Sequence, residues 1–129
     1  MLKNTRIVTM VVLFAAICFA EPSLKNPWEI DNTEAKLLDL LQSEKLQTRF
    51  DAAVALGERD CLPAVDKLCE MLQNDENYQG RIGAALALYE MECTEALSVL
   101  KKMAKCDSNV VVRNISKGIV RRLDQSIQL

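Results

Sequence analysis

Three arginines recur along the chain at intervals of 32 residues, at Arg49, Arg81 and Arg113. A guanidinium binds carboxylates and phosphates through paired hydrogen bonds, so a row of such arginines could bind an acidic partner or phosphate groups. Each arginine also follows an acidic loop near a predicted helix start. There it can bond loop carbonyls or the aspartate of the preceding unit, Asp75 or Asp107. We favour this structural role over the binding role.

Histidine is absent from the sequence, which removes the commonest general base and metal ligand. Ser-His-Asp and Cys-His nucleophile arrangements and mixed Cys/His zinc sites are therefore excluded. The acidic residues that stand near predicted helix starts and turns lack the spacing of a calcium loop: Asp31, Glu34, Asp39, Asp75 and Glu76. We expect no enzyme activity, no metal and no cofactor. The net charge of −2 argues against nucleic-acid binding.

Four cysteines lie beyond the N-terminal segment: Cys61, Cys69, Cys93 and Cys106. An even number in an exported protein favours disulfides, but the predicted spacing opposes them. Cys61 and Cys69 would lie about 12 Å apart along one helix. Cys61 and Cys93 occupy equivalent places in neighbouring units, about 8–10 Å apart, and a disulfide tolerates only about 7 Å between Cα atoms. We expect buried thiols that act as small apolar side chains.

Residues 1–20 have the pattern of a secretory signal peptide. Lys3 and Arg6 precede an uncharged, apolar run from Ile7 to Phe19, and the small residue Ala20 stands before a polar segment. This order predicts export and cleavage after Ala20, which places the protein in the periplasm or outside the cell.

Two alternatives to a cleaved signal stay open. An uncleaved membrane anchor is one, although the apolar run is shorter than the roughly 20 residues that a span needs. The other is a lipoprotein anchored through Cys18, although the residues before this cysteine differ from the usual lipoprotein pattern.

A repeat of 32 residues organises the rest of the chain. Residues 49–57 and 81–89 match at the arginine, three alanines and a leucine, and residues 113–121 repeat the pattern more loosely. Apolar residues at three- and four-residue steps split each unit into two helices. We predict a linker at 21–32, a helical domain at 33–124 and a C-terminal tail at 125–129. Within the domain, helices are predicted near 33–42, 46–57, 62–73, 78–90, 94–105 and 109–124, with Gly57 as a left-handed cap.

Six amphipathic helices in antiparallel hairpins predict an all-α, right-handed α-solenoid, because no single helix can bury its apolar face alone. Ala52, Ala84 and Ser116 are small at equivalent positions, where neighbouring helices must approach closely. The last unit departs from the pattern, because Lys117 stands where the earlier units have alanine. We expect that face to be exposed and to cap the stack.

This arrangement resembles HEAT repeats, in particular the short HEAT-like repeats of the phycobilisome lyase type. The resemblance rests on Arg49-(x)2-Ala52-(x)3-Leu56-Gly57 and Arg81-(x)2-Ala84-(x)3-Leu88, and it covers about residues 33–123. It implies a scaffold that binds proteins rather than a reaction. Deoxyhypusine hydroxylase, a related HEAT-like family, holds iron through His-Glu pairs, so the lack of histidine excludes that activity.

Charge is divided unevenly along the chain. Residues 21–95 contain seven Lys/Arg and 16 Asp/Glu, a net charge of −9, whereas residues 96–129 contain seven and two, a net charge of +5. In a linear stack this predicts one acidic and one basic end. The uneven charge is either an ordinary solvated surface, a basic end that docks an acidic protein or an anionic membrane surface, or the cause of weak head-to-tail self-association.

The second helix of each pair is the expected contact surface, because that layer lines the concave face in the family that the chain resembles. Six charged residues of this layer are candidates for partner binding: Asp66, Lys67, Glu70, Lys101, Lys102 and Lys105. The sequence thus predicts an exported protein-interaction module with an unidentified protein partner. A non-catalytic subunit or assembly factor of an envelope enzyme complex, and a lipid-anchored structural protein of the envelope, are the alternatives.

Overall fold

The computed structural model describes residues 30–128, which form six α-helices and no strand. The α-helices are α2 (Asn32–Leu40), α3 (Leu46–Glu58), α4 (Val65–Asn74), α5 (Tyr78–Glu90), α6 (Leu97–Cys106) and α7 (Val110–Ile127). Single 3₁₀ turns at Leu62–Ala64 and Thr94–Ala96 lead into α4 and α6. The predicted signal peptide at 1–20 and most of the predicted linker lie outside the described residues. The last helix extends to Ile127, three residues beyond its expected end.

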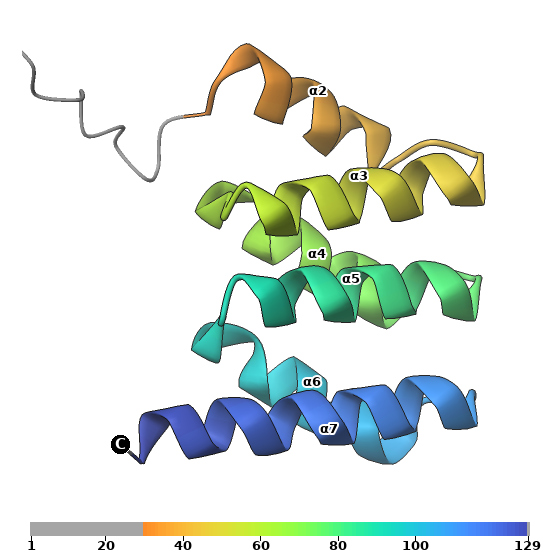
Figure 1. The fold of residues 1–129 in the computed structure, drawn as a ribbon. Helices are drawn as coiled ribbons and strands as arrows, with labels where there is room; N and C mark the ends of the chain where they lie inside the picture. The colour runs from red at the N-terminus through yellow and green to blue at the C-terminus, as the bar shows by residue number, and fades with distance from the viewer. Residues whose placement is uncertain (1–29, 129) are drawn as a thin grey trace, which may run out of the picture.

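The helices are arranged as a two-layered stack (Figure 1). Helices α3, α5 and α7 lie side by side in one layer, and α4 and α6 lie behind them. Helix α4 packs mainly on α5, and α6 mainly on α7, so each second helix leans on the first helix of the following unit. This arrangement confirms the prediction of an all-α, HEAT-like solenoid.

Asparagine and aspartate side chains begin several of the helices. Asp31 caps α2 in a capping box with Glu34, and the Asn77 side chain accepts a hydrogen bond from the backbone N–H of Gln79 at 3.0 Å to cap α5. Asn109 caps α7 in the same way, 2.8 Å from the backbone nitrogen of Val111. These caps satisfy backbone donors that a helix start otherwise leaves open, which explains why the polar breaks in the sequence coincide with helix boundaries.

The prediction that Gly57 is a left-handed cap is wrong. Gly57 lies within α3, and the left-handed positions are Asp60 (φ 52°) and Glu92 (φ 47°), in the two equivalent turns. A Cβ atom on Gly57 would lie 2.7 Å from the Cα of Ala87, so glycine is required because the backbones of α3 and α5 touch. A glycine near a helix end can act as a left-handed cap or allow a close helix contact, and only the position of the neighbouring helix shows which role applies.

The core lies between the two layers and between neighbouring helices of one layer. Its largest fully buried apolar side chains are Leu56, Leu68, Leu72, Leu88, Leu100 and Val112. The prediction of close helix approach at Ala52, Ala84 and Ser116 is consistent with the structure, since all three are buried, and Lys117 is exposed as expected. None of the described helices combines the length and apolar character that crossing a membrane requires.

Candidate protein-interaction surface

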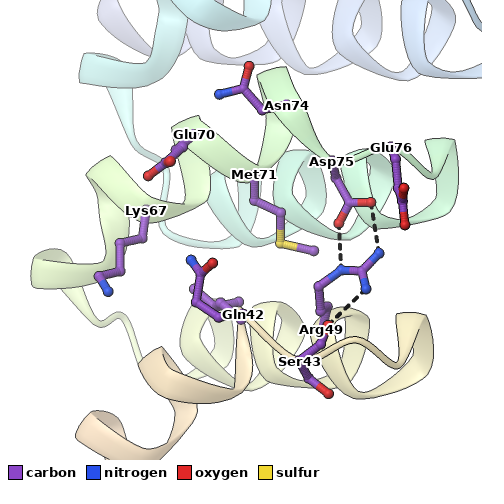
Figure 2. Close-up of a pocket in the computed structure, with 10 residues that line it drawn as sticks. Gln42, Ser43, Arg49, Lys67, Glu70, Met71, Asn74, Asp75 and Glu76 are labelled. Carbon is purple, nitrogen blue, oxygen red and sulfur yellow. Dashed lines mark hydrogen bonds and ion pairs between the residues drawn. The ribbon is translucent and has the colours of Figure 1, made fainter.

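The first arginine of the repeat joins three segments of the chain (Figure 2). Its Nε and Nη2 atoms donate to Oδ2 and Oδ1 of Asp75 at 2.8 and 2.9 Å, while Nη1 donates to the backbone carbonyls of Ser43 and Glu44 at 2.9 and 3.1 Å. The guanidinium of Arg49 therefore holds the loop before α3 against the loop after α4. The side chain of Asp75 is only 4% exposed.

The second arginine repeats this geometry. Nε and Nη2 of Arg81 donate to Asp107 at 2.8 and 3.0 Å, and Nη1 donates to the backbone carbonyl of Asp75 at 2.7 Å. Arg113 keeps the carbonyl contacts, to Asp107 at 2.5 Å and Ser108 at 3.1 Å, but has no carboxylate partner among residues 30–128. The arginines therefore stabilise the fold, as we favoured.

The source of each carboxylate differs from the expectation. We expected each arginine to meet the aspartate of the preceding unit, but Arg49 and Arg81 bind the aspartate at the end of their own unit, Asp75 and Asp107. The preceding loop supplies only carbonyls. The two groups meet because they lie at the same end of an antiparallel helix pair, Arg49 near the start of α3 and Asp75 at the end of α4.

The ion pair sets the protonation of Asp75. Burial alone would raise the pKa of this carboxyl, but the hydrogen bonds from Arg49 and from the backbone of Asn77 outweigh it, and the pKa lies below its ordinary value. The same pair raises the pKa of Arg49, chiefly through the hydrogen bond to Asp75. Both groups stay charged at neutral pH, which suits an ion pair that holds two loops together.

A polar cleft of about 320 Å³ opens beside the Arg49–Asp75 ion pair, between the α2–α3 loop and α4. Lys67, Glu70 and Asn74 follow one edge of α4, Gln42 faces them from the loop, and Met71 lies between (Figure 2). The residues that follow α2, Leu41 to Ser43, line the cleft on the side opposite α4, and α2 is one residue shorter than α4. Helix α2 ends at Leu40, whereas α4 continues for two further residues at the equivalent place one period later.

The six predicted binding residues are all exposed and all lie on α4 or α6, but they do not form one patch. Two of them, Lys67 and Glu70, line the cleft, and Asp66 stands outside it. Lys102 donates to the side chain of Gln73 on α4 at 3.2 Å, which connects the two helices. The remaining two, Lys101 and Lys105, line a separate groove between α6 and α7.

The sequence prediction of the surface omitted residues on other elements. Lys117 and Arg121 of α7 share the second groove with the two α6 lysines, and Gln42 belongs to the cleft. The four-residue spacing of Lys117 and Arg121, which equals that of Lys101 and Lys105, was the available signal. No sequence signal marks Gln42, because its place in the cleft depends on where α2 ends.

No disulfide joins Cys61, Cys69, Cys93 and Cys106 to one another. Cys61 and Cys93 are buried, as expected, whereas Cys106 is exposed at the end of α6, so the expectation of burial is wrong there. Burial raises the pKa of the Cys69 thiol to about 11, which leaves it protonated and weakly nucleophilic at neutral pH. Within residues 30–128 no three cysteine or carboxylate side chains are grouped so as to hold a metal ion.

A scan against protein-family models matches residues 34–117 to HEAT repeats. The chain belongs to the HEAT-repeat family. The match runs from α2 into α7 and so includes both arginine–aspartate junctions. HEAT repeats generally mediate protein–protein interactions and are generally non-catalytic scaffolds. No curated protein matches the chain.

Proposed function

We propose that this chain is an exported, non-catalytic HEAT module that binds a partner protein on the layer formed by α4 and α6. The observation that carries the proposal is the polar cleft beside α4, which lies on the layer expected to bind and is lined by two of the predicted residues, Lys67 and Glu70. The family membership and the exposure of all six candidates support it.

The cleft suits a peptide segment with mixed polar and apolar side chains. Lys67 supplies a cation, Glu70 an anion, and Gln42 and Asn74 supply amide donors and acceptors. Met71 gives a floor whose flexible thioether adapts to different apolar groups. The buried ion pair at one end keeps the loop and α4 in place, so binding requires little ordering of the cleft.

Site-specific cross-linking tests the location of the binding surface. A photoreactive amino acid at Lys67 should form an adduct with one partner protein in native cell envelope, and the same group at Leu86, exposed on α5 in the other layer, should not. Adducts of equal yield at both positions, or at neither, contradict the proposal. If the partner is a subunit of an enzyme complex, a change in that enzyme's activity on mixing identifies an assembly or subunit role.

A charge swap then measures the contribution of the cleft. The Lys67→Glu/Glu70→Lys pair preserves net charge and should weaken binding of the purified partner by about tenfold or more, as calorimetry measures. Lys36→Glu/Asp39→Lys on α2 is the matched control, because it also exchanges exposed charges three residues apart and lies outside the cleft. Equal losses in the two variants contradict a specific cleft.

Export is proposed from the sequence of residues 1–20. Cell fractionation followed by N-terminal sequencing should find the mature chain beginning at Glu21 in the periplasm or medium. A lipid-modified Cys18 or an intact N-terminus in the membrane fraction identifies one of the two anchored alternatives. Recovery of the intact chain from the cytoplasm contradicts export.

A further inference from the structure

A groove of about 370 Å³ lies between α6 and α7, outside the cleft described above. Ala104 and Val120 form its apolar floor. Two pairs of cations form its rim: Lys101 and Lys105 on α6, and Lys117 and Arg121 on α7. Within each pair the residues are four positions apart, so both side chains point to the same side of their helix.

The equivalent surface one unit earlier is part of the core. One period before the groove residues stand Cys69, Leu72 and Gln73 on α4, and Ala85, Leu88 and Tyr89 on α5. Of these, Leu72, Ala85 and Leu88 are completely buried, because α6 and α7 pack against α4 and α5. The α6–α7 groove is thus the place where a further helix would pack, and no described helix follows α7.

The charges on the groove have a single sign. Lys101 contacts Asp124 at 3.4 Å, but no carboxylate pairs with Lys105, Lys117 or Arg121 among residues 30–128. Like charges four residues apart disfavour a helix, and both helices carry such a pair. The end of a solenoid stays soluble with a polar face of either charge sign. Solubility alone therefore does not explain the uniformly positive rim around an apolar floor, which fits a negatively charged partner.

We propose that the α6–α7 groove binds an acidic amphipathic helix of the partner protein, which takes the place of a next repeat. This inference rests on the proposed function and assigns it a second, distinct contact site. The apolar stripe of such a helix covers Ala104 and Val120, and carboxylates on both sides of the stripe pair with the four cations. A free phosphate would meet the cations and leave the floor uncovered.

A second copy of this chain fits the groove less well. The exposed charges of α2 and its loop, at the other end of the stack, include Lys36, Asp39, Glu44 and Lys45. Because both signs are mixed there, the described residues of that end present no acidic stripe to the groove. Charge complementarity therefore favours a helix from another protein.

Fluorescence anisotropy with a labelled peptide tests the inference on the whole chain. The probe is a helix of about five turns with an Ala/Leu stripe flanked by glutamates four residues apart. It should bind with an affinity that falls as salt rises. A peptide of the same composition without the amphipathic order should bind at least about tenfold more weakly, because it cannot cover the floor and pair the rim together.

Charge reversal on α7 locates the site. Lys117→Glu/Arg121→Glu should weaken the amphipathic peptide by about tenfold or more. Lys36→Glu/Lys45→Glu is the control, since it changes net charge equally at exposed positions near the other end. All four positions are exposed, so both variants should keep the far-UV circular dichroism of the parent; Lys117→Gln/Arg121→Gln should show a smaller loss of the same direction.

Several results overturn the inference. Equal weakening in both charge-reversal variants means unspecific attraction, and equal affinity for both peptides means a simple anion site. If Lys117→Glu/Arg121→Glu loses binding to phosphatidylserine vesicles but keeps its peptide affinity, the groove is assigned to a membrane surface. If the same variant loses a concentration-dependent dimer that the parent forms, the groove is assigned to a second copy. Lys67→Glu/Glu70→Lys should leave the affinity for the amphipathic peptide unchanged, because these residues lie outside the groove. If the groove does not bind the peptide, the proposed function of the cleft is therefore not contradicted.

Discussion

Ser116 is a buried polar residue in a position that the other units give to alanine. Its side chain is fully buried in α7, and its hydroxyl has no hydrogen-bond partner among the described residues. Ala52 and Ala84 occupy the equivalent places in α3 and α5. A buried hydroxyl without a partner lowers stability by about 1–3 kcal/mol, so this position is a weak point of the third unit.

Replacing this serine should stabilise the protein. Ser116→Ala removes the unpaired hydroxyl and introduces a better helix former, so the free energy of unfolding should rise by about 1 kcal/mol in urea denaturation. Ala84→Ser is the matched control, because it puts a hydroxyl into the same environment one unit earlier and should lower the free energy by a similar amount. A less stable Ser116→Ala protein would show that the hydroxyl is bonded.

Two glycines with different surroundings should respond to alanine in opposite directions. Gly57→Ala places a methyl group against the backbone of Ala87, so helices must shift, and the free energy of unfolding should fall by about 1–3 kcal/mol. Gly118→Ala adds a methyl group to open space on α7 and should raise it by about 0.5–1 kcal/mol. Thermal unfolding followed by circular dichroism measures both, and a change of the same sign in both would contradict the packing at Gly57.

At the scale of elements, one aspartate joins three helices. Asp75 ends α4, accepts two hydrogen bonds from Arg49 of α3, and accepts one from the backbone of Asn77 immediately before α5. Asp107 repeats this set of contacts between α5, α6 and α7. One period before Asp75 this position is Ser43, after α2, for which no first helix of the pair is described that would supply an arginine.

Loss of the Asp75 carboxylate should change stability in a pH-dependent way. The folded pKa of Asp75 is lowered, so its contribution is present above the unfolded pKa of about 3.9 and is lost as pH falls through the folded value. Asp75→Asn should therefore lower the free energy of unfolding at pH 7 by about 3 kcal/mol and by much less at pH 2. Urea denaturation at both values measures the difference. An equal loss at both pH values would contradict the role of the charge.

At the scale of the whole molecule, the described units make their main contacts with their neighbours. Stability in such a stack is the sum of unit terms and interface terms, so weakening one junction should affect the segments on its far side first. The Arg49–Asp75 junction holds α2 and α3 to the rest, and the Arg81–Asp107 junction holds α6 and α7.

Hydrogen exchange should reveal this separation. Asp75→Asn should increase amide exchange in α2 and α3 more than in α7, and Asp107→Asn should increase it in α6 and α7 more than in α2. Mass spectrometry of peptic fragments resolves the two ends. A uniform increase along the chain in both variants would show that the six helices unfold only as one unit.

The sequence by itself determined the period, the helices and the structural role of the arginines. Apolar spacing within 32 residues fixes where each helix lies, and polar residues such as Asn77 and Asn109 mark the boundaries because their caps act locally. Small residues at equivalent positions indicated where neighbouring helices pack closely.

Only the tertiary structure decided which neighbours meet. It assigned Gly57 to a contact with Ala87, gave Arg49 the aspartate at the end of its own unit, exposed Cys106, and divided the predicted binding residues between the cleft and the groove. Each of these depends on how far one helix leans over the next. That geometry comes from contacts between helices that are distant in sequence, and a local pattern carries no information about it.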